Sequence, residues 1–211
     1  MAVSETIVRE FFEMHGLLVH QRRKFVAPSG RDEEEIDFLV LNPQPRPAAE
    51  PWPFVLGAGE LSRISRAIVV VKGWHTETFS FARLERVPGI YRFVEADVLE
   101  QARSFFGGDA PIQRLLVLPA LPQDEEGRAQ SIELLRSKGV DAVLPFRTIL
   151  ADLIARTESN RNYQKSDLLQ IIRVLKNYDF FREPQLELFK ARRPRRPATP
   201  AAEPGGTASA G

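Results

Sequence analysis

The chain has 211 residues, of which 43% are hydrophobic and 27% are charged, so it can bury one sizeable core. Its 29 basic residues nearly balance its 28 acidic residues, and a net charge of +1 indicates no bulk attraction to nucleic acid or to a membrane. It has no cysteine, which excludes disulfide bonds and thiolate metal sites, and no stretch approaches the roughly 18 apolar residues of a membrane span. We therefore expect a cytoplasmic protein with no membrane partner.

The first part of the chain predicts a helix followed by a hairpin. Ser4 is placed to cap the helix and Gly16 to end it, because the apolar residues between them recur near helical spacing. Two extended runs, 17–26 and 35–41, flank a cluster of turn-forming residues, which predicts two paired strands. The loop 43–58 then interrupts regular structure, because its several prolines cannot continue a hydrogen-bonded ladder.

The remaining predicted elements alternate between helices and strands. In chain order they are a short helix over 60–65, a strand over 67–72, a helix over 97–106, a strand over 113–119, a helix over 125–138, a strand over 140–144 and two helices within 147–179. This alternation predicts a single α/β domain over residues 1–190. Residues 191–211 are rich in proline, glycine and alanine with a cluster of arginines, and we expect this tail to be disordered.

Two charged residues stand out within apolar runs. Asp37 lies inside the predicted strand IDFLV, where an ionised carboxylate costs several kcal/mol unless it is paired or binds a cation. Lys72 closes the β-branched run IVVV, and the two-residue period of a strand puts it on the same face as Val70. Neighbouring strands could therefore bring Asp37 and Lys72 together.

The order of these features resembles the PD-(D/E)XK nuclease superfamily, which includes restriction endonucleases and archaeal Holliday-junction resolvases. The features that carry the resemblance are, in chain order, a helix with Glu5, GLLV at Gly16, EEEIDFLV around Asp37 and IVVVKGW around Lys72. The resemblance covers roughly residues 4 to 122. It implies a restriction-endonuclease-like αβββαβ core, with a mixed central sheet flanked by helices and with additional C-terminal helices.

The resemblance also implies roles for single residues. Asp37 would be the principal ligand of a Mg²⁺ ion, Lys72 would position or stabilise the attacking oxygen, and Glu5 would be an auxiliary carboxylate. In this family the metal lowers the pKa of a bound water that attacks the scissile phosphate.

The chain departs from the family at the acid of the acidic-X-lysine tripeptide. That position is Val70, which offers no oxygen ligand. A metal would then depend on Asp37, the carbonyl of Val71, waters and an acid relocated from elsewhere, for which Glu77 is the nearest downstream candidate.

Nucleic-acid contacts are predicted at two places. Arg22, Arg23 and Lys24 form a basic cluster on the first strand that could contact phosphates, although a charged strand edge that resists aggregation explains it equally well. His75 follows the third strand and could hold a phosphate or a proton, whereas an exposed loop histidine is the commoner case.

Three functions remain open. The first is a nuclease-like protein whose catalysis is impaired or lost and which binds DNA or RNA. The second is an active Mg²⁺-dependent endonuclease with a relocated acid, and the third is a protein-interaction scaffold of unrelated α/β fold. The sequence leaves the oligomeric state open.

Overall fold

A computed structural model describes most of the domain. The described residues are 3–21, 36–46, 52–73, 75, 79–108 and 110–181. Four predictions fall outside them: the basic cluster from Arg22 to Lys24, Glu77, most of the predicted turn and strand residues between 22 and 35, and the tail 191–211.

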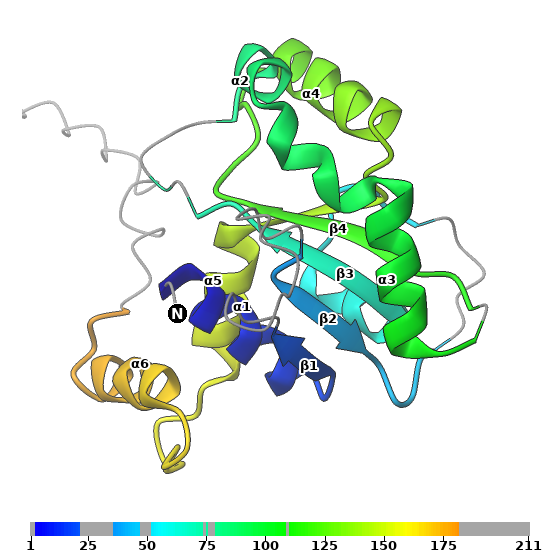
Figure 1. Cartoon of the computed structure of the whole chain (residues 1–211). Coiled ribbons are helices and arrows are strands. Elements are labelled where there is room, and N and C mark those ends of the chain that lie inside the picture. Colours follow the sequence, from blue (N-terminus) through cyan, green and yellow to red (C-terminus); the bar gives the residue numbers. More distant parts are fainter. Residues whose placement is uncertain are drawn as a thin grey trace, which may run out of the picture.

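A five-stranded mixed sheet forms the centre of the fold, with its strands in sequence order (Figure 1). The strands are β1 (Leu18–Gln21), β2 (Phe38–Leu41), β3 (Arg66–Val71), β4 (Gln113–Leu118) and β5 (Ala142–Pro145). The first three pair antiparallel, whereas β3, β4 and β5 pair parallel. The prediction of one mixed sheet with an N-terminal helix against it is confirmed, and the chain is an α/β protein.

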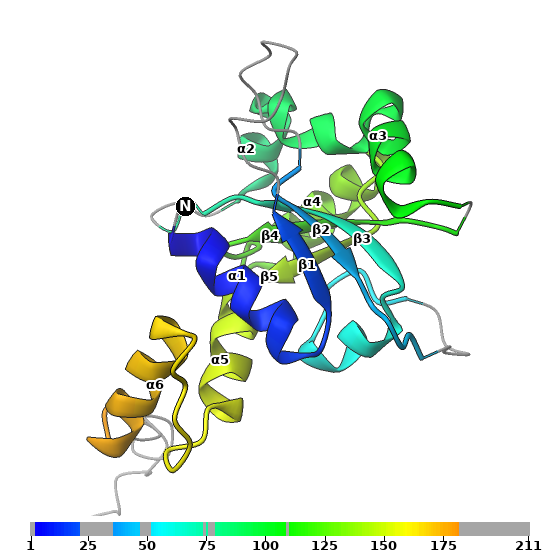
Figure 2. The same ribbon diagram turned by 60° about the horizontal axis from the view of Figure 1, so that its bottom comes forward.

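Helices cover both faces of this sheet (Figures 1 and 2). The α-helices are α1 (Val3–Met14), α2 (Phe81–Arg86), α3 (Ala96–Phe106), α4 (Glu125–Ser137), α5 (Phe146–Arg156) and α6 (Asp167–Asn177), with 3-10 helices η2 (Ala58–Arg63) and η3 (Pro88–Val94). One face carries α1 and α5, which pack against each other, and the other carries α2, α3 and α4. Figure 2 places α6 beside α5, at the outer side of that layer.

Strand alternation divides the apolar side chains into two core clusters. Val69 of β3 faces the layer of α1 and α5, where it joins Phe11 and Leu153, and all three are fully buried. Ile68 and Val70 of the same strand face the opposite layer. A strand that is covered on both faces needs a continuous apolar run, which explains the sequence RAIVVV.

The amino ends of β4 and β5 are tied by an ion pair that the sequence did not suggest. Asp141 accepts hydrogen bonds from the backbone N–H of Arg114 at 2.7 Å and from its Nε at 2.9 Å and Nη2 at 2.7 Å. The hydrogen bond to Asp141 raises the pKa of the Arg114 guanidinium further above its ordinary value. A bidentate ion pair of this kind fixes the relative orientation of the two side chains and also pairs their charges.

Several element boundaries differ from the predicted ones. Asp37 lies just before β2 rather than inside a strand, and Lys72 lies just after β3. The predicted strand 140–144 begins two residues later, because Gly139 turns with a φ of 92° and Asp141 is used by Arg114. The segment holding α2 and η3 carried no prediction, because Ser80 caps only a six-residue helix, too short for a clear periodic pattern.

Within the described part of the chain, no helix has both the length and the apolar character needed to cross a membrane.

Candidate functional site at the carboxyl edge of the sheet

The candidate residues gather at one edge of the sheet because of strand direction. The parallel strands β3, β4 and β5 all end at this edge, and β2 begins there because it runs antiparallel to β3. Asp37, which precedes β2, and Lys72, which follows β3, therefore share the edge. In open α/β sheets this carboxyl edge is where ligands usually bind.

The Asp37 carboxylate is engaged by the backbone of β3. Its Oδ2 accepts a hydrogen bond from the N–H of Val71 at 2.6 Å, and the N–H of Asp37 donates to the carbonyl of Val69 at 3.0 Å. The half-buried side chain thus continues the β2–β3 ladder beyond the strand. Val71 therefore contacts Asp37 through its backbone N–H. The sequence had suggested a different role for Val71, with its carbonyl as a metal ligand.

Val70 lies in an apolar environment. It is 3% exposed and packs in the core cluster on the α3 side of the sheet. Strand alternation directs the half-buried Lys72 to the same face, and the backbone N–H of Lys72 extends the parallel ladder to the carbonyl of Val117 at 2.9 Å. An acid at position 70 would therefore stand among buried hydrocarbon side chains.

Glu5 lies on the other face of the sheet. It projects from the first turn of α1, and its Oε2 accepts a hydrogen bond from Nε2 of Gln21 at 2.9 Å. This contact joins α1 to the edge strand β1. Because Lys72 follows Val70 in alternation, the structure places Glu5 and Lys72 on opposite faces, and a joint contact with one phosphate would require one of them to reach around the edge.

The turn after β3 brings two helix N-termini together. A Cβ at Gly73 would clash with Oγ of Ser4 and stand 2.8 Å from its Cβ, so only glycine allows this approach. Nε2 of His75 lies 2.9 Å from Oγ of Ser4, and the His75 ring packs edge-on against Phe146, with 4.4 Å between the centroids. Ser4 and Phe146 stand in the first turns of α1 and α5.

Ser4 and Phe146 were not predicted as parts of this site. Ser4 was assigned to cap α1, but α1 already includes Val3, and the Ser4 hydroxyl contacts His75 instead. Phe146 stands 71 residues beyond His75 in sequence and carries no local motif. The one signal that could have been used was Gly73 directly after a buried strand, since a glycine there often marks a close approach of another backbone or side chain.

The charges at this edge are mixed. Lys72, His75 when protonated, and the positive ends of the α1 and α5 dipoles attract anions, whereas Glu5 and Asp37 oppose them. The carboxylates are already engaged, Glu5 by Gln21 and Asp37 by a backbone N–H. The arrangement can therefore support weak anion binding better than binding of a bare divalent cation.

The described residues do not fit a Mg²⁺ site. Among them there is no group of three or more histidine, aspartate or glutamate side chains that could hold a metal ion. Mg²⁺ requires about six oxygen ligands, commonly with one or two carboxylates. Here one oxygen of Asp37 is used by the ladder and Val70 supplies none, while Glu77 lies outside the described residues.

Comparison of the chain with protein-family models, with curated proteins and with solved structures finds no match. A function for the chain is therefore proposed from its own fold and side chains.

Proposed function

We propose that this chain is a nuclease-like domain that binds nucleic acid and has lost metal-dependent cleavage. The observation that carries the proposal is the order and pairing of its elements. A helix is followed by three antiparallel strands, and then by helices and a parallel strand, with Asp37 and Lys72 at the shared edge of β2 and β3. This order agrees with a restriction-endonuclease-like αβββαβ core.

The loss of cleavage is supported by two side chains. Val70 stands where the family has its second metal-binding acid, and its apolar surroundings suit valine well. One oxygen of the Asp37 carboxylate already accepts the hydrogen bond from the N–H of Val71. Together they leave too few oxygen ligands among the described residues for the metal that activates water in this family.

Retained binding is supported by the basic groups near the edge. His75 stands beside the N-termini of α1 and α5, Lys72 follows β3 at the same edge of the sheet, and the sequence adds the predicted contacts of Arg22, Arg23 and Lys24. Contacts between such groups and phosphates account for most non-specific affinity for DNA or RNA, and they weaken as salt is raised.

Fluorescence anisotropy with labelled duplex DNA, single-stranded DNA and RNA tests the binding. We expect a Kd that rises steeply with salt, and a further rise of roughly three- to tenfold for Lys72→Ala, since one phosphate contact contributes about 1 kcal/mol. Lys165→Ala removes the same charge from the exposed loop before α6 and should change the Kd by less than about twofold. Incubation with Mg²⁺ or Mn²⁺ should yield no cleavage products on a gel.

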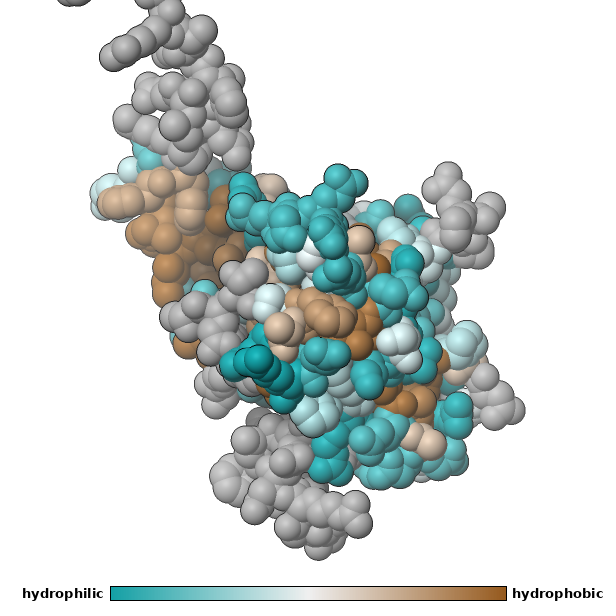
Figure 3. All heavy atoms as spheres, turned by 90° about the horizontal axis from the view of Figure 1, so that it is seen from above, coloured by the Kyte–Doolittle hydropathy of each residue, from teal (hydrophilic) through white to brown (hydrophobic). Residues whose placement is uncertain are grey.

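Two outcomes would replace the proposal. Metal-dependent cleavage that requires both Asp37 and Glu77 would establish the active endonuclease with a relocated acid. Absence of binding to every nucleic acid at low salt would favour the protein-interaction scaffold. The observation in favour of the scaffold is the exposed apolar surface of α6 and the residue after it, where Ile171, Val174 and Tyr178 are 57%, 42% and 74% exposed. They lie on the side of the molecule where Figure 3 shows a broad apolar area.

A further inference from the structure

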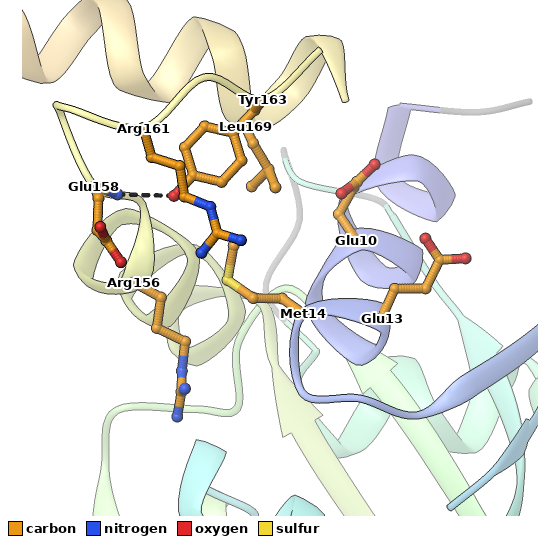
Figure 4. Close-up of a pocket in the computed structure, with 8 residues that line it drawn as sticks. All are labelled: Glu10, Glu13, Met14, Arg156, Glu158, Arg161, Tyr163 and Leu169. Carbon is orange, nitrogen blue, oxygen red and sulfur yellow. Dashed lines mark hydrogen bonds between the residues drawn. The ribbon is translucent and has the colours of Figure 1, made fainter. Parts of the chain in front are cut away.

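A cavity lies between α1 and the loop that joins α5 to α6 (Figure 4). The cavity has a volume of about 560 Å³, within the usual range for small-molecule sites. Its lining residues come from α1, the end of α5, the loop and α6, and they are Glu10, Glu13, Met14, Arg156, Glu158, Arg161, Tyr163 and Leu169.

The α1 wall of this cavity is acidic. Glu10 and Glu13 stand one helical turn apart on α1, and Figure 4 shows them across the cavity from the loop. Burial raises the pKa of the Glu10 carboxyl above its ordinary value, with a smaller opposing effect from its hydrogen bond to Ser166. Glu13 pairs with the exposed Arg9 at 2.8 Å. A cationic group in the cavity would offset the cost of burying the Glu10 charge.

The opposite wall is mixed in charge, because it carries Arg156, Glu158 and Arg161. Arg161 lies over the ring of Tyr163, with its guanidinium carbon 5.8 Å from the ring centroid, and Figure 4 shows the guanidinium extending into the cavity. No carboxylate of the described residues pairs with it, whereas Arg156 is held by Asp152 at 3.0 Å. Arg161 is therefore placed to receive an anionic group.

The loop that carries Arg161 is held in place by several hydrogen bonds. The Tyr163 hydroxyl accepts from the backbone N–H of Glu158 at 2.9 Å, and the backbone N–H of Tyr163 donates to Oε1 of Gln170 at 3.2 Å. Lys176 donates through Nζ to the carbonyl of Thr157 at 2.7 Å, which ties α6 to the end of α5. A wall that is fixed before binding reduces the entropy lost when a ligand is held.

Between the charged walls the surface is apolar. Met14 and Leu169 line it, and Leu169 belongs to the main core cluster, which anchors this part of the cavity. We propose that the cavity binds a small zwitterion whose ammonium and carboxylate groups are separated by an apolar chain, such as an ω-amino acid or a dipeptide. The ammonium would face Glu10 and Glu13 and the carboxylate would face Arg161.

Charge separation selects this class of ligand. In an α-amino acid the two charges are roughly 3 Å apart with no apolar chain between them, whereas Met14 and Leu169 give this cavity an apolar lining beside its charged groups. In 6-aminohexanoate the two groups stand roughly 6–8 Å apart, and the methylenes between them match the apolar lining.

Isothermal titration with 6-aminohexanoate tests the inference on the full-length chain, with hexylamine and hexanoate as controls that each lack one charge. We expect saturable millimolar binding of the zwitterion and at least fivefold weaker binding of each control, because each leaves one charged wall unpaired. Arg161→Gln and Glu10→Gln should each weaken zwitterion binding by at least fivefold.

The matched substitutions Arg86→Gln and Glu85→Gln remove the same charges from the exposed surface of α2 on the opposite layer, and they should leave the binding unchanged. Circular dichroism melts establish that each variant is folded. Absence of saturable binding up to about 50 mM, equal binding of all three compounds, or unchanged binding in both cavity variants would overturn the inference. The result does not depend on whether the carboxyl edge binds nucleic acid.

Discussion

Substitution of Asp37 separates a structural carboxylate from a metal ligand. A hydrogen bond to a charged acceptor contributes about 1.5–3 kcal/mol when it is buried. Asp37 is half-buried, so water can partly replace it at the N–H of Val71, and we expect Asp37→Ala to lower the free energy of unfolding by about 1–2 kcal/mol. For a domain of this size that corresponds to a melting temperature lower by about 2–8 °C. Asp37→Asn keeps an acceptor oxygen and should lose less than about 1 kcal/mol.

Urea denaturation followed by circular dichroism measures these differences, in EDTA and again with Mg²⁺. Asp97→Ala is the matched control, because Asp97 is exposed in the first turn of α3 and should contribute only a few tenths of a kcal/mol through the helix dipole. The wild-type melting temperature should shift by less than about 1 °C with Mg²⁺, because a metal that does not bind the folded state cannot stabilise it.

If Asp37→Ala does not lower the free energy of unfolding, the structural role of the Asp37 carboxylate is refuted. Carboxylates gathered for a cation repel one another when the cation is absent, so removing one of them stabilises the metal-free protein. If Asp37→Ala is as stable as wild type in EDTA, and if Mg²⁺ stabilises only the wild type, then the hydrogen bond to Val71 is incidental and Asp37 is a metal ligand.

Three further substitutions test the fold around the site, each by urea denaturation. Gly73→Ala should lose about 1–3 kcal/mol through its clash with the first turn of α1, whereas Gly59→Ala has no atom within 4 Å of the new Cβ and should lose less than about 1 kcal/mol; equal losses would contradict the close approach. Asp141→Ala should lose about 1–2 kcal/mol, because the pair with Arg114 is only partly exposed, and a loss near zero would show that the pair behaves like a surface ion pair. Val70→Glu should lose at least about 3 kcal/mol without metal, because its carboxylate would enter an apolar cluster; a loss below about 1 kcal/mol would place position 70 in contact with solvent.

The α/β class and most elements could be predicted from local patterns. The run IVVV predicted a strand because β-branched residues suit a sheet covered on both faces, and β3 contains it. The helix predicted over 97–106 matches α3 to within one residue, because Gly107 ends it with a positive φ. The ends of strands were less predictable where a side chain replaces a backbone group in the sheet. At Asp37 the carboxylate, and not a backbone carbonyl, accepts the hydrogen bond from the N–H of Val71.

The site could be predicted only in part. Asp37 and Lys72 stood out because a charge inside an apolar run is costly, and both do lie at one edge of the sheet. His75 contacts Ser4 and Phe146, which lie about 70 residues before it and after it in the sequence. Patterns within a short stretch of sequence cannot predict contacts between residues so far apart in the chain. The cavity beside Arg161 could not be predicted for the same reason, because the glutamates that face Arg161 belong to the first helix of the chain.

The packing of α1 against α5 makes the first element of the chain depend on one of the last. Phe11 and Phe12 belong to the same core cluster as Ile149 and Leu153, so their burial cannot be completed until α5 has been synthesised. Ribosomes add about 5–20 residues per second, so the delay is roughly 7–30 seconds. During this time the part of the core that α5 completes stays open to other contacts, and a product that stops before α5 lacks that cover.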